Sequence, residues 1–446
     1  MLLFFLLLCT TIADPATWWG SYGDPVLTSL VQRASRENLD IKSALARVAE
    51  ARALARQTKS ALEPSINLNV SAQQLRGGFQ DGIIRIPQSA SGGGPSLITP
   101  FETGLISGNA DMRWELSFWG PSSKALNAAR SDALSQEESA GEVRLIVAAE
   151  VAMAYFELRG AERQLDVLRR NRARQADLLA LTRDRAVAGL STQLDVERQA
   201  SSLAALEAEI PRFDSQRQSQ LNRLAVLLAD RDLVKGALPA APRQWAVPPF
   251  GDGIDSALLL RRPDVRAAQA RILAAAARLK AAQSERYPRL FLTGLAGRQA
   301  TSLTGLSLGS GNFFGFGPQL VLPIFTGGRL RANIEASDAR LDQARIEYEQ
   351  EILAAFQEAE DAIAAYRAEQ ARLDRLGEAS TAAQSALKLS EDVYRAGLGD
   401  FLAVLDAQRS VLELDQAIAQ ARTSALVQSV LLFKALAGGW PAGSSR

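Results

Sequence analysis

The feature that most limits how this chain can fold is an internal repeat, because two long parts of the sequence follow one pattern. Residues 40–47 (DIKSALAR) align with residues 264–271 (DVRAAQAR) at an offset of 224 positions. The alignment continues without a gap as far as Leu68 and Leu292. Two copies of this length indicate internal duplication and not a solenoid, which stacks many short units.

Farther along the chain the repeat continues at a different offset. Gly120 aligns with Gly328, and Gly189 with Gly397, at 208 positions. The first copy therefore carries 16 additional residues (224 − 208), which we place in the Gly-, Ser- and Pro-rich residues 77–103. The expected organisation is a leader (1–13), a first copy (14–238), a Pro-rich linker (239–262), a second copy (263–440) and a tail (441–446).

Each copy predicts a helix, two strands, a very long helix and a further helix. The first helix covers residues 25–62 in one copy and 263–286 in the other, and each ends shortly before a proline. The long helices cover residues 122–188 and 329–396, which contain no proline. At ~1.5 Å per residue these helices approach ~100 Å, a length typical of coiled-coil or tubular packing.

Both long helices stop at the tripeptide Ala-Gly-Leu, which predicts a tight turn before the next helix. Gly189 and Gly397 fit the left-handed backbone position that follows a helix. Thr192 and Asp400 are residue types that cap the start of the following helix. We therefore expect two helical hairpins of the same design.

Two stretches of the first copy, residues 66–73 and 106–118, alternate between apolar and polar residues. This period of two predicts strands with one apolar and one polar face. A glycine cluster at residues 309–317 of the second copy is expected to form an outer loop that enters a strand. The apolar residues expected to face a membrane are Met112, Trp114, Leu116 and Phe118.

Four strands per chain with one apolar and one charged face suit a membrane barrel, with lipid outside and water inside. Four strands cannot close a barrel, so the chain must oligomerise if the strands span a membrane. Two chains could close a barrel with a filled interior, whereas three would leave an aqueous lumen. A charged inner face suits the aqueous lumen of a trimer better than the filled interior of a dimer.

Composition argues against an enzyme. The chain has 50 basic and 49 acidic residues, and this balance gives no electrostatic footprint for nucleic acid. Histidine is absent and Cys9 is the only cysteine, so a disulfide within the chain is impossible. The sequence shows no zinc, phosphate-loop or nucleophile-elbow motif. We therefore expect no catalytic residue, no metal and no cofactor.

The apolar residues 2–8 are too few to span a bilayer and are typical of an export signal. Cys9 directly follows them and is a candidate for lipid attachment. Cleavage after Ala13, where small residues precede Asp14, is an alternative, and a third is that Cys9 is only part of the apolar leader. The first two readings both imply export from the cytoplasm.

The motifs, in their order and spacing, resemble the TolC-like outer-membrane efflux family, in particular its NodT-type lipoprotein branch. The resemblance extends from Trp18 to Trp440. The matching segments are Trp18-Trp19 with Asp24-Pro25, residues 260–265 (LRRPDV), 323–325 (PIF) with Gly327-Gly328, 404–408 (VLDAQ) and 434–440 (KALAGGW). One difference is the short segment between Cys9 and Trp18, which leaves the lipid anchor less well supported than the channel.

The resemblance implies a mainly α-helical chain with a small membrane β part. Three chains would form a homotrimer with a 12-stranded transmembrane β-barrel, continued by a long α-helical barrel in the periplasm. The implied partners are a periplasmic adaptor protein, an inner-membrane efflux pump and outer-membrane lipid. The expected function is a passive exit duct for drugs or other small solutes in the cell outer membrane.

Two other functions stay open at this point. The same channel could serve a protein or oligosaccharide secretion system. A non-channel helical scaffold in the periplasm is disfavoured, because such a scaffold has no use for strands with an apolar face.

By resemblance, Leu402 and Asp406 match the inner constriction of the family at the periplasmic tip. They lie four residues apart on one helix and so share a face, which suits a gate. The two turns that follow the long helices are the expected docking points for the adaptor. Their residues are Gly189, Leu190, Ser191, Thr192, Gly397, Leu398, Gly399 and Asp400.

Overall fold

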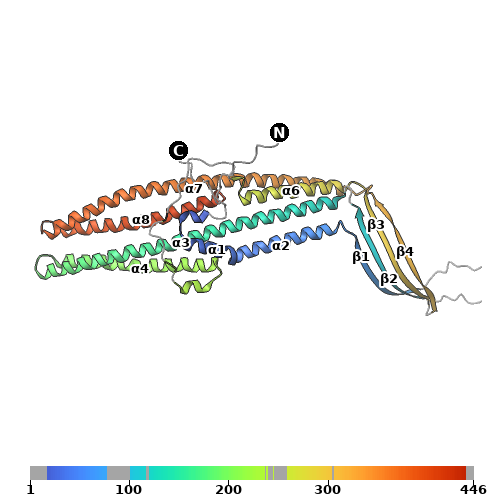
Figure 1. Cartoon of the computed structure of the whole chain (residues 1–446), viewed down its shortest axis with the longest axis horizontal. Coiled ribbons are helices and arrows are strands. Elements are labelled where there is room, and N and C mark those ends of the chain that lie inside the picture. Colours follow the sequence, from blue (N-terminus) through green and yellow to red (C-terminus); the bar gives the residue numbers. More distant parts are fainter. Residues whose placement is uncertain are drawn as a thin grey trace, which may run out of the picture. The chain divides into compact units, whose positions relative to one another are not determined.

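The computed structural model describes residues 18–77, 101–116, 120–236, 238–239, 245, 259–303 and 306–437. The chain is mainly helical with one four-stranded sheet, and the two copies present their elements in the same order (Figure 1). No helix within these ranges has an apolar run long enough to cross a membrane. The leader with Cys9, Phe118, most of the linker and the tail lie outside the described residues, so the expectations for them stay predictions.

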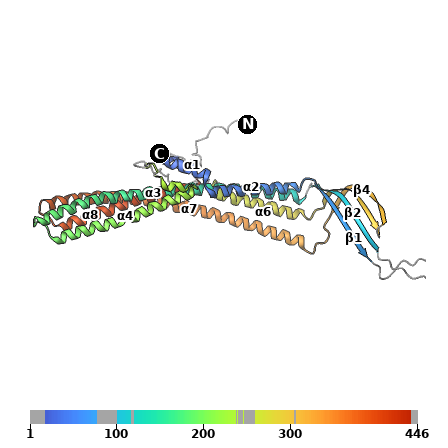
Figure 2. The same cartoon turned by 90° about the horizontal axis from the view of Figure 1, so that it is seen from below.

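The long helices of the two copies correspond residue for residue. α3 (Pro121–Val187) and α7 (Arg329–Arg395) each contain 67 residues. α4 (Gln193–Leu227) and α8 (Phe401–Ala435) each contain 35, and α4 continues through Pro211. α3 runs antiparallel to α4, and α7 to α8, as two hairpins (Figures 1 and 2). The predicted proline-free helices and the offset of 208 are confirmed.

The first helix of the first copy is divided, contrary to the prediction of one helix over residues 25–62. It consists of α1 (Pro25–Glu37) and α2 (Leu39–Ser60), which meet at Asn38. The buried side-chain oxygen of Asn38 accepts hydrogen bonds from the backbone N–H groups of Asp40 and Ile41. An asparagine oxygen in this position caps a new helix, which explains the break. The corresponding helix of the second copy, α6 (Pro263–Ser284), is continuous.

The four strands form one antiparallel sheet in the order β1-β2-β3-β4. They are β1 (Ser65–Gly77), β2 (Phe101–Leu116), β3 (Arg289–Leu303) and β4 (Leu306–Val321). The connection from β1 to β2 spans residues 78–100, whereas residues 304–305 join β3 to β4. The additional residues of the first copy therefore lie where the repeat predicts.

The glycine-rich residues 309–317 lie inside β4 and not in a loop, so that expectation was wrong. Glycine weakens a strand because it has no side chain to pack. β4 nevertheless pairs with β3 along nearly its whole length, and these ladder hydrogen bonds outweigh the weak local preference.

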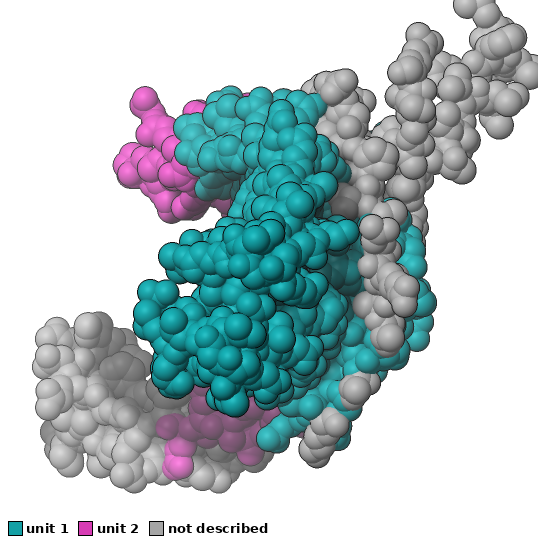
Figure 3. All heavy atoms as spheres, turned by 90° about the vertical axis from the view of Figure 1, so that its left-hand side faces the viewer, with its two compact units in different colours: residues 1–49, 134–269, 346–446 teal, residues 50–133, 270–345 magenta. Residues whose placement is uncertain are grey.

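The chain divides into two compact units, and each unit takes segments from both copies of the repeat (Figure 3). Unit 1 contains residues 1–49, 134–269 and 346–446, and unit 2 contains residues 50–133 and 270–345. Unit 2 holds the sheet together with the adjoining ends of four helices. Its helical core is small, with Ala275, Leu341 and Ala344 at the centre.

The main core of unit 1 fastens the N-terminal segment to two long helices. The 3-10 helix η1 (Trp18–Tyr22) places the Trp18 ring in a stack on Phe433 of α8, with 5.0 Å between the ring centroids. The Tyr22 ring meets Phe156 of α3 edge-on at 5.0 Å. A second short 3-10 helix, η2 (Arg231–Lys235), follows α4.

Asp24 is the polar centre of this core. One carboxylate oxygen accepts hydrogen bonds from the backbone N–H groups of Val26 and Leu27 and so caps α1. The other accepts from the Tyr155 hydroxyl at 2.6 Å and from Trp245 Nε1 at 2.9 Å. Burial and the neighbouring Asp24 raise the pKa of Tyr155, so this phenol remains a hydrogen-bond donor. A buried carboxylate is tolerated here because donors surround it.

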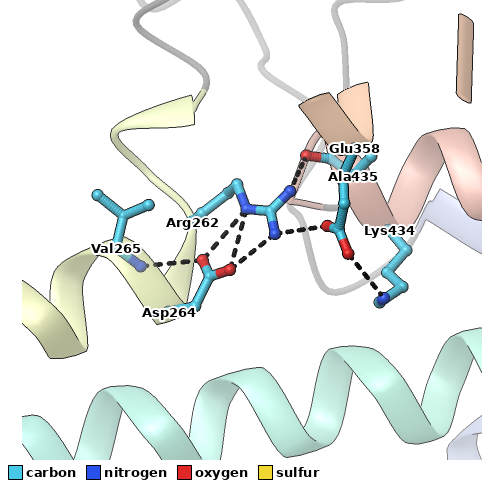
Figure 4. A network of polar contacts seen from close by, with 6 residues as sticks. All are labelled: Arg262, Asp264, Val265, Glu358, Lys434 and Ala435. Atoms are coloured by element: carbon cyan, nitrogen blue, oxygen red, sulfur yellow. Dashed lines mark hydrogen bonds and ion pairs between the residues drawn. The ribbon is translucent and has the colours of Figure 1, made fainter. Parts of the chain in front are cut away.

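A second polar centre joins α6 to α7 and α8 (Figure 4). The buried guanidinium of Arg262 contacts the carboxylates of Asp264 and Glu358, each at 2.7 Å, and donates to the backbone carbonyl of Ala435. Glu358 also pairs with Lys434 at 3.6 Å. Burial alone would raise the pKa of Asp264, but the hydrogen bonds and charge of Arg262 outweigh it and lower this pKa.

The lowered pKa of Asp264 makes stability depend on pH. The carboxylate contributes stability above its unfolded pKa of about 4, and this contribution is lost as the pH falls through the lower folded value. Asp264→Asn should reduce the free energy of unfolding by about 2 kcal/mol at pH 7, and the difference from wild type should shrink below about pH 4.

Denaturant unfolding followed by far-UV circular dichroism at several pH values measures this difference. The matched control is Asp342→Asn, which removes an exposed carboxylate paired with Arg345 and should change stability by less than about 1 kcal/mol. If the free energy of unfolding lost in Asp264→Asn does not change with pH, the pH dependence cannot be assigned to the Asp264 carboxylate.

Candidate functional site

The first candidate site is the turn between α3 and α4. Gly189 follows the helix with φ 71°, and Leu190 N–H donates to the carbonyl of Arg185 at 2.8 Å. Thr192 and Asp195 then form a reciprocal cap at the start of α4. Burial raises the pKa of Asp195, but hydrogen bonds from Thr192 and Ser191 outweigh this and lower it. The predicted glycine and cap positions are confirmed.

The turn between α7 and α8 has the same construction. Gly397 has φ 75°, and Leu398 N–H donates to the carbonyl of Val393. The Asp400 side chain caps α8 by accepting from Leu402 N–H at 3.2 Å. A Cβ atom at Gly399 would meet Val393 Cγ1 at 2.8 Å, so a glycine keeps this turn compact.

Both turns carry exposed apolar side chains at the end of a long hairpin. Leu398 is 83% exposed and Leu190 is 68% exposed, and Val187 and Leu194 are also exposed. Water-exposed leucine and valine side chains gathered at one end of an element are typical of a contact surface for a partner. These turns contain the residues that the sequence predicted for adaptor docking.

The predicted gate residues lie on the exposed face of α8. Leu402 is 43% exposed, and Asp406 one turn farther along is exposed as well. On the opposite side of the helix, Phe401 and Val404 are buried against Tyr394. The shared face of Leu402 and Asp406 is therefore available to another molecule or another copy.

The structure adds a contact that sequence reasoning missed. The Arg185 guanidinium near the end of α3 lies 4.6 Å from the centroid of the Tyr394 ring near the end of α7. It also donates a hydrogen bond to the Tyr394 backbone carbonyl at 3.4 Å. Tyr394 in turn packs against Phe401, next to Leu402. This link ties the first hairpin to the second beside the candidate gate.

The second candidate site is the sheet, whose two faces differ as predicted. In the register, Ile66 pairs with Met112, Met112 with Gly294, and Gly294 with Phe316, so these residues share one face. The other residues of this apolar face include Leu68, Val70, Ile106, Trp114, Leu116, Leu290, Leu292, Ala296, Phe314 and Leu320. Three of the four predicted residues, Met112, Trp114 and Leu116, thus lie on one apolar face, and the fourth, Phe118, lies outside the described residues.

The opposite face of the sheet is mainly polar, with Leu295 and Phe313 among the exceptions. Asn67 and Asn69 of β1 both donate to the carboxylate of Asp111 on β2. Near the helical end of the sheet, Arg113 and Arg289 lie 4.3 and 5.1 Å from the Phe291 ring centroid. This face suits water, whereas the other face suits an apolar medium.

The described residues contain no cluster of acidic, histidine or cysteine side chains that could hold a metal ion. The arrangement offers three surfaces for contact, the apolar sheet face and the two exposed hairpin tips. Exposed apolar surfaces of this kind are typical of contact with other molecules or with an apolar medium.

Comparisons with known proteins agree with this geometry. Residues 30–230 and 255–438 match the family described as Outer membrane efflux protein. Outer membrane protein OprJ of Pseudomonas aeruginosa is 33% identical over 438 residues, covering 97% of this chain and 88% of OprJ. The toluene efflux pump outer membrane protein TtgF of Pseudomonas putida is 32% identical over 431 residues, covering 96% of this chain and 86% of TtgF.

A solved structure has the same fold. The outer-membrane channel OprN matches with a TM-score of 0.81 and 29% identity, covering 97% of this chain and 94% of that chain. Mainly helical with one small antiparallel sheet, the chain has the fold of the TolC-like outer-membrane channels, and it belongs to the outer membrane efflux protein family.

Proposed function

We propose that three copies of this chain form an exit channel in the cell outer membrane. The observation that carries the proposal is a four-stranded sheet with one apolar face, one polar face and two edge strands, β1 and β4, that pair with no other strand of the described residues. Three such sheets joined edge to edge give twelve strands and a water-filled lumen. Membership of the outer membrane efflux protein family supports the location in the outer membrane. Four strands per chain, too few to close a barrel alone, support the trimer.

In this proposal the apolar face lies against lipid, with Met112, Trp114 and Leu116 among its residues. Trp114 Nε1 donates to the backbone carbonyl of Leu62 at 2.8 Å, so the ring is fixed at the helical end of the sheet. Tryptophan with one apolar and one hydrogen-bonding side is enriched at membrane interfaces. The helices then extend into the periplasm.

The two exposed tips are the proposed docking points for a periplasmic adaptor protein, which connects the channel to an inner-membrane efflux pump. Leu190 and Leu398 support this assignment because they expose apolar surface at the end of each hairpin. The proposed cargo is a drug or another small solute. TtgF, named for toluene efflux, supports a small solute over a protein or oligosaccharide. The scaffold alternative leaves the apolar sheet face without a role.

Leu402 and Asp406 form the proposed gate. In a trimer, three leucine side chains would make an apolar constriction that resists wetting, and three carboxylates beside it would favour cations. Arg185 and Tyr394 hold the second hairpin against α3 and would keep this constriction closed. The first copy has Leu194 and Arg198 at the corresponding positions, so only the second copy has a carboxylate at the position of Asp406.

The double change Leu402→Ala and Asp406→Ala should open the channel. It removes the apolar bulk and the charge of the constriction, while the sheet and the buried helix faces remain intact. Single-channel conductance in planar bilayers should rise severalfold, and the preference for cations should fall. The variant should migrate as the same trimer as wild type in cross-linking experiments.

The control is Leu194→Ala with Arg198→Ala, the corresponding positions of the first hairpin, which should conduct like wild type. If the control opens the channel and the Leu402/Asp406 variant does not, the two hairpins have been assigned in the wrong order. A wild-type chain that yields only monomers and dimers on cross-linking would contradict the channel itself.

Replacing an exposed tip leucine by a charged residue should weaken adaptor docking. Leu190→Asp or Leu398→Asp places a charge in a contact that we expect to be apolar, at a cost of roughly 1–3 kcal/mol. Co-purification with a periplasmic adaptor protein that binds the wild-type chain should fall by roughly tenfold or more. The control is Val226→Asp, since Val226 is also exposed but lies at the far end of α4. Equal losses in the control and the tip variants would exclude the tips as docking points.

A further inference from the structure

The apolar face of the sheet carries one charged residue among those whose side chains are described. Arg298 of β3 pairs with Gly108 of β2 and Asn312 of β4, and all three lie on the same face as Phe314 and Phe316. The arginine is exposed. Toward the helical end of the sheet, the residues of β3 on this face are Leu290, Leu292, Gly294 and Ala296, which are all uncharged.

The position of Arg298 along the strand corresponds to the outer limit of a membrane. It lies eight residues beyond Leu290, or about 27 Å at ~3.4 Å per residue. A strand tilted by about 40° spans roughly 20 Å of bilayer over that length, close to the apolar band of about 25 Å on membrane barrels. Arg298 therefore falls at the outer end of this apolar band, on the side away from the helices, where a long arginine side chain reaches the lipid headgroups.

The guanidinium of Arg298 has spare hydrogen-bonding capacity. It donates to Ser310 Oγ of β4 at 3.0 Å, and no carboxylate pairs with it within the described part of the chain. Its neighbour Gly108 leaves the space beside it open, because a Cβ atom there would meet nothing within 4 Å. A charge next to lipid is costly unless an anion compensates it, and a guanidinium binds phosphate through two parallel hydrogen bonds.

The surface below Arg298 suits an acyl chain. Small residues, Gly108, Ala110 and Ala296, form a strip over β2 and β3. Exposed Leu68 and Val70 border this strip on β1, and Phe314, which is 88% exposed, borders it on β4. A hydrocarbon chain laid on this strip would reach Arg298 with its head.

We infer that Arg298, with Ser310 and Asn312, binds the phosphate of an outer-leaflet glycolipid, the lipid A part of lipopolysaccharide. The site rests on the proposed function, since it requires this face to meet lipid, and the trimer would carry three copies. The apolar strip favours a lipid over free phosphate, because it adds acyl contact to the phosphate contact.

Native mass spectrometry of the detergent-purified trimer, mixed with defined lipids, tests the site. Wild type should retain diphosphoryl lipid A in preference to dephosphorylated lipid A and to phosphatidylcholine. Arg298→Gln should reduce retention of diphosphoryl lipid A by roughly tenfold, the loss expected for a charge-assisted hydrogen bond. Arg298→Lys should recover part of the binding, because it keeps the charge but not the paired donors.

Arg331→Gln is the matched control, since it removes an exposed arginine of α7 outside the sheet, and it should bind lipid A like wild type. Equal retention by Arg298→Gln and wild type would overturn the site, as would equal retention of the dephosphorylated lipid. Displacement of lipid A by millimolar inorganic phosphate alone would show a simple anion site and also overturn it.

Conductance measurements distinguish a failure of the lipid site from a failure of the proposed channel. Arg298→Gln should conduct like wild type in planar bilayers, because Arg298 lies on the face away from the lumen. Normal conductance with unchanged lipid A binding contradicts only the lipid site. A wild-type chain that neither trimerises nor inserts contradicts the proposed function and the lipid site together.

Discussion

The open edges of the four-stranded sheet are the constraint on which the proposed assembly depends. β1 and β4 each present a row of backbone N–H and C=O groups that pair with no strand of the described residues. Such groups are costly in a bilayer, where no water can satisfy them. Contact between copies is therefore a condition for insertion. Because the edges come from the first strand of one repeat and the last strand of the other, a β1 edge can meet a β4 edge and close a ring.

The two copies of the repeat are similar, but they differ at the residue that directly precedes α2 in the first copy and α6 in the second. Asn38 directly precedes α2, and Arg262 directly precedes α6, at the offset of 224. Asn38 donates to the backbone carbonyl of Leu227, the last residue of α4, and Arg262 donates to that of Ala435, the last residue of α8. We call these two contacts the junctions of the copies. Each junction supplies a hydrogen-bond donor to a helix-end carbonyl that has no partner within its own helix.

The charge at these two junctions is different. Asn38 is neutral and also caps α2, whereas Arg262 brings a positive charge that draws in Asp264 and Glu358. Glu358 belongs to α7, so only the second junction is tied to a long helix through an ion pair. A buried ion pair is sensitive to the loss of one partner, so the second junction depends on pH through the Asp264 carboxylate.

The local features of the fold could be predicted from the sequence. The helices followed from proline-free residues, the turns from Gly189 and Gly397, and the faces of the sheet from alternation around Met112 and Trp114. These features depend on neighbours in the chain. The break at Asn38 was missed although its capping bonds to Asp40 and Ile41 are local, and only its additional bond to the Leu227 carbonyl spans 189 residues. The contact between Arg185 and Tyr394, 209 residues apart, could not be predicted, because no local pattern connects them.

For the candidate sites, the sequence predicted which residues are exposed but not what holds them. Leu402 and Asp406 share an exposed face, as their spacing requires. The contact that positions them, Tyr394 between Arg185 and Phe401, depends on how two distant hairpins pack. Arg298 was missed for a different reason. Its place on the apolar face follows only from the register of β3 with β2 and β4.

The distribution of buried aromatic residues indicates where unit 1 can change shape at low cost. At the level of Asp24, the core contains Trp18, Tyr22, Tyr155, Phe156 and Phe433, with hydrogen bonds from α3 and the linker to Asp24 at the start of α1. Near the tips, the core cluster consists of Tyr394, Phe401 and Val404. Because less apolar surface is buried there, separating α7 and α8 from α3 near the tip costs less than at the middle. The gate that we propose at Leu402 would therefore open while the segment around Asp24 keeps its structure.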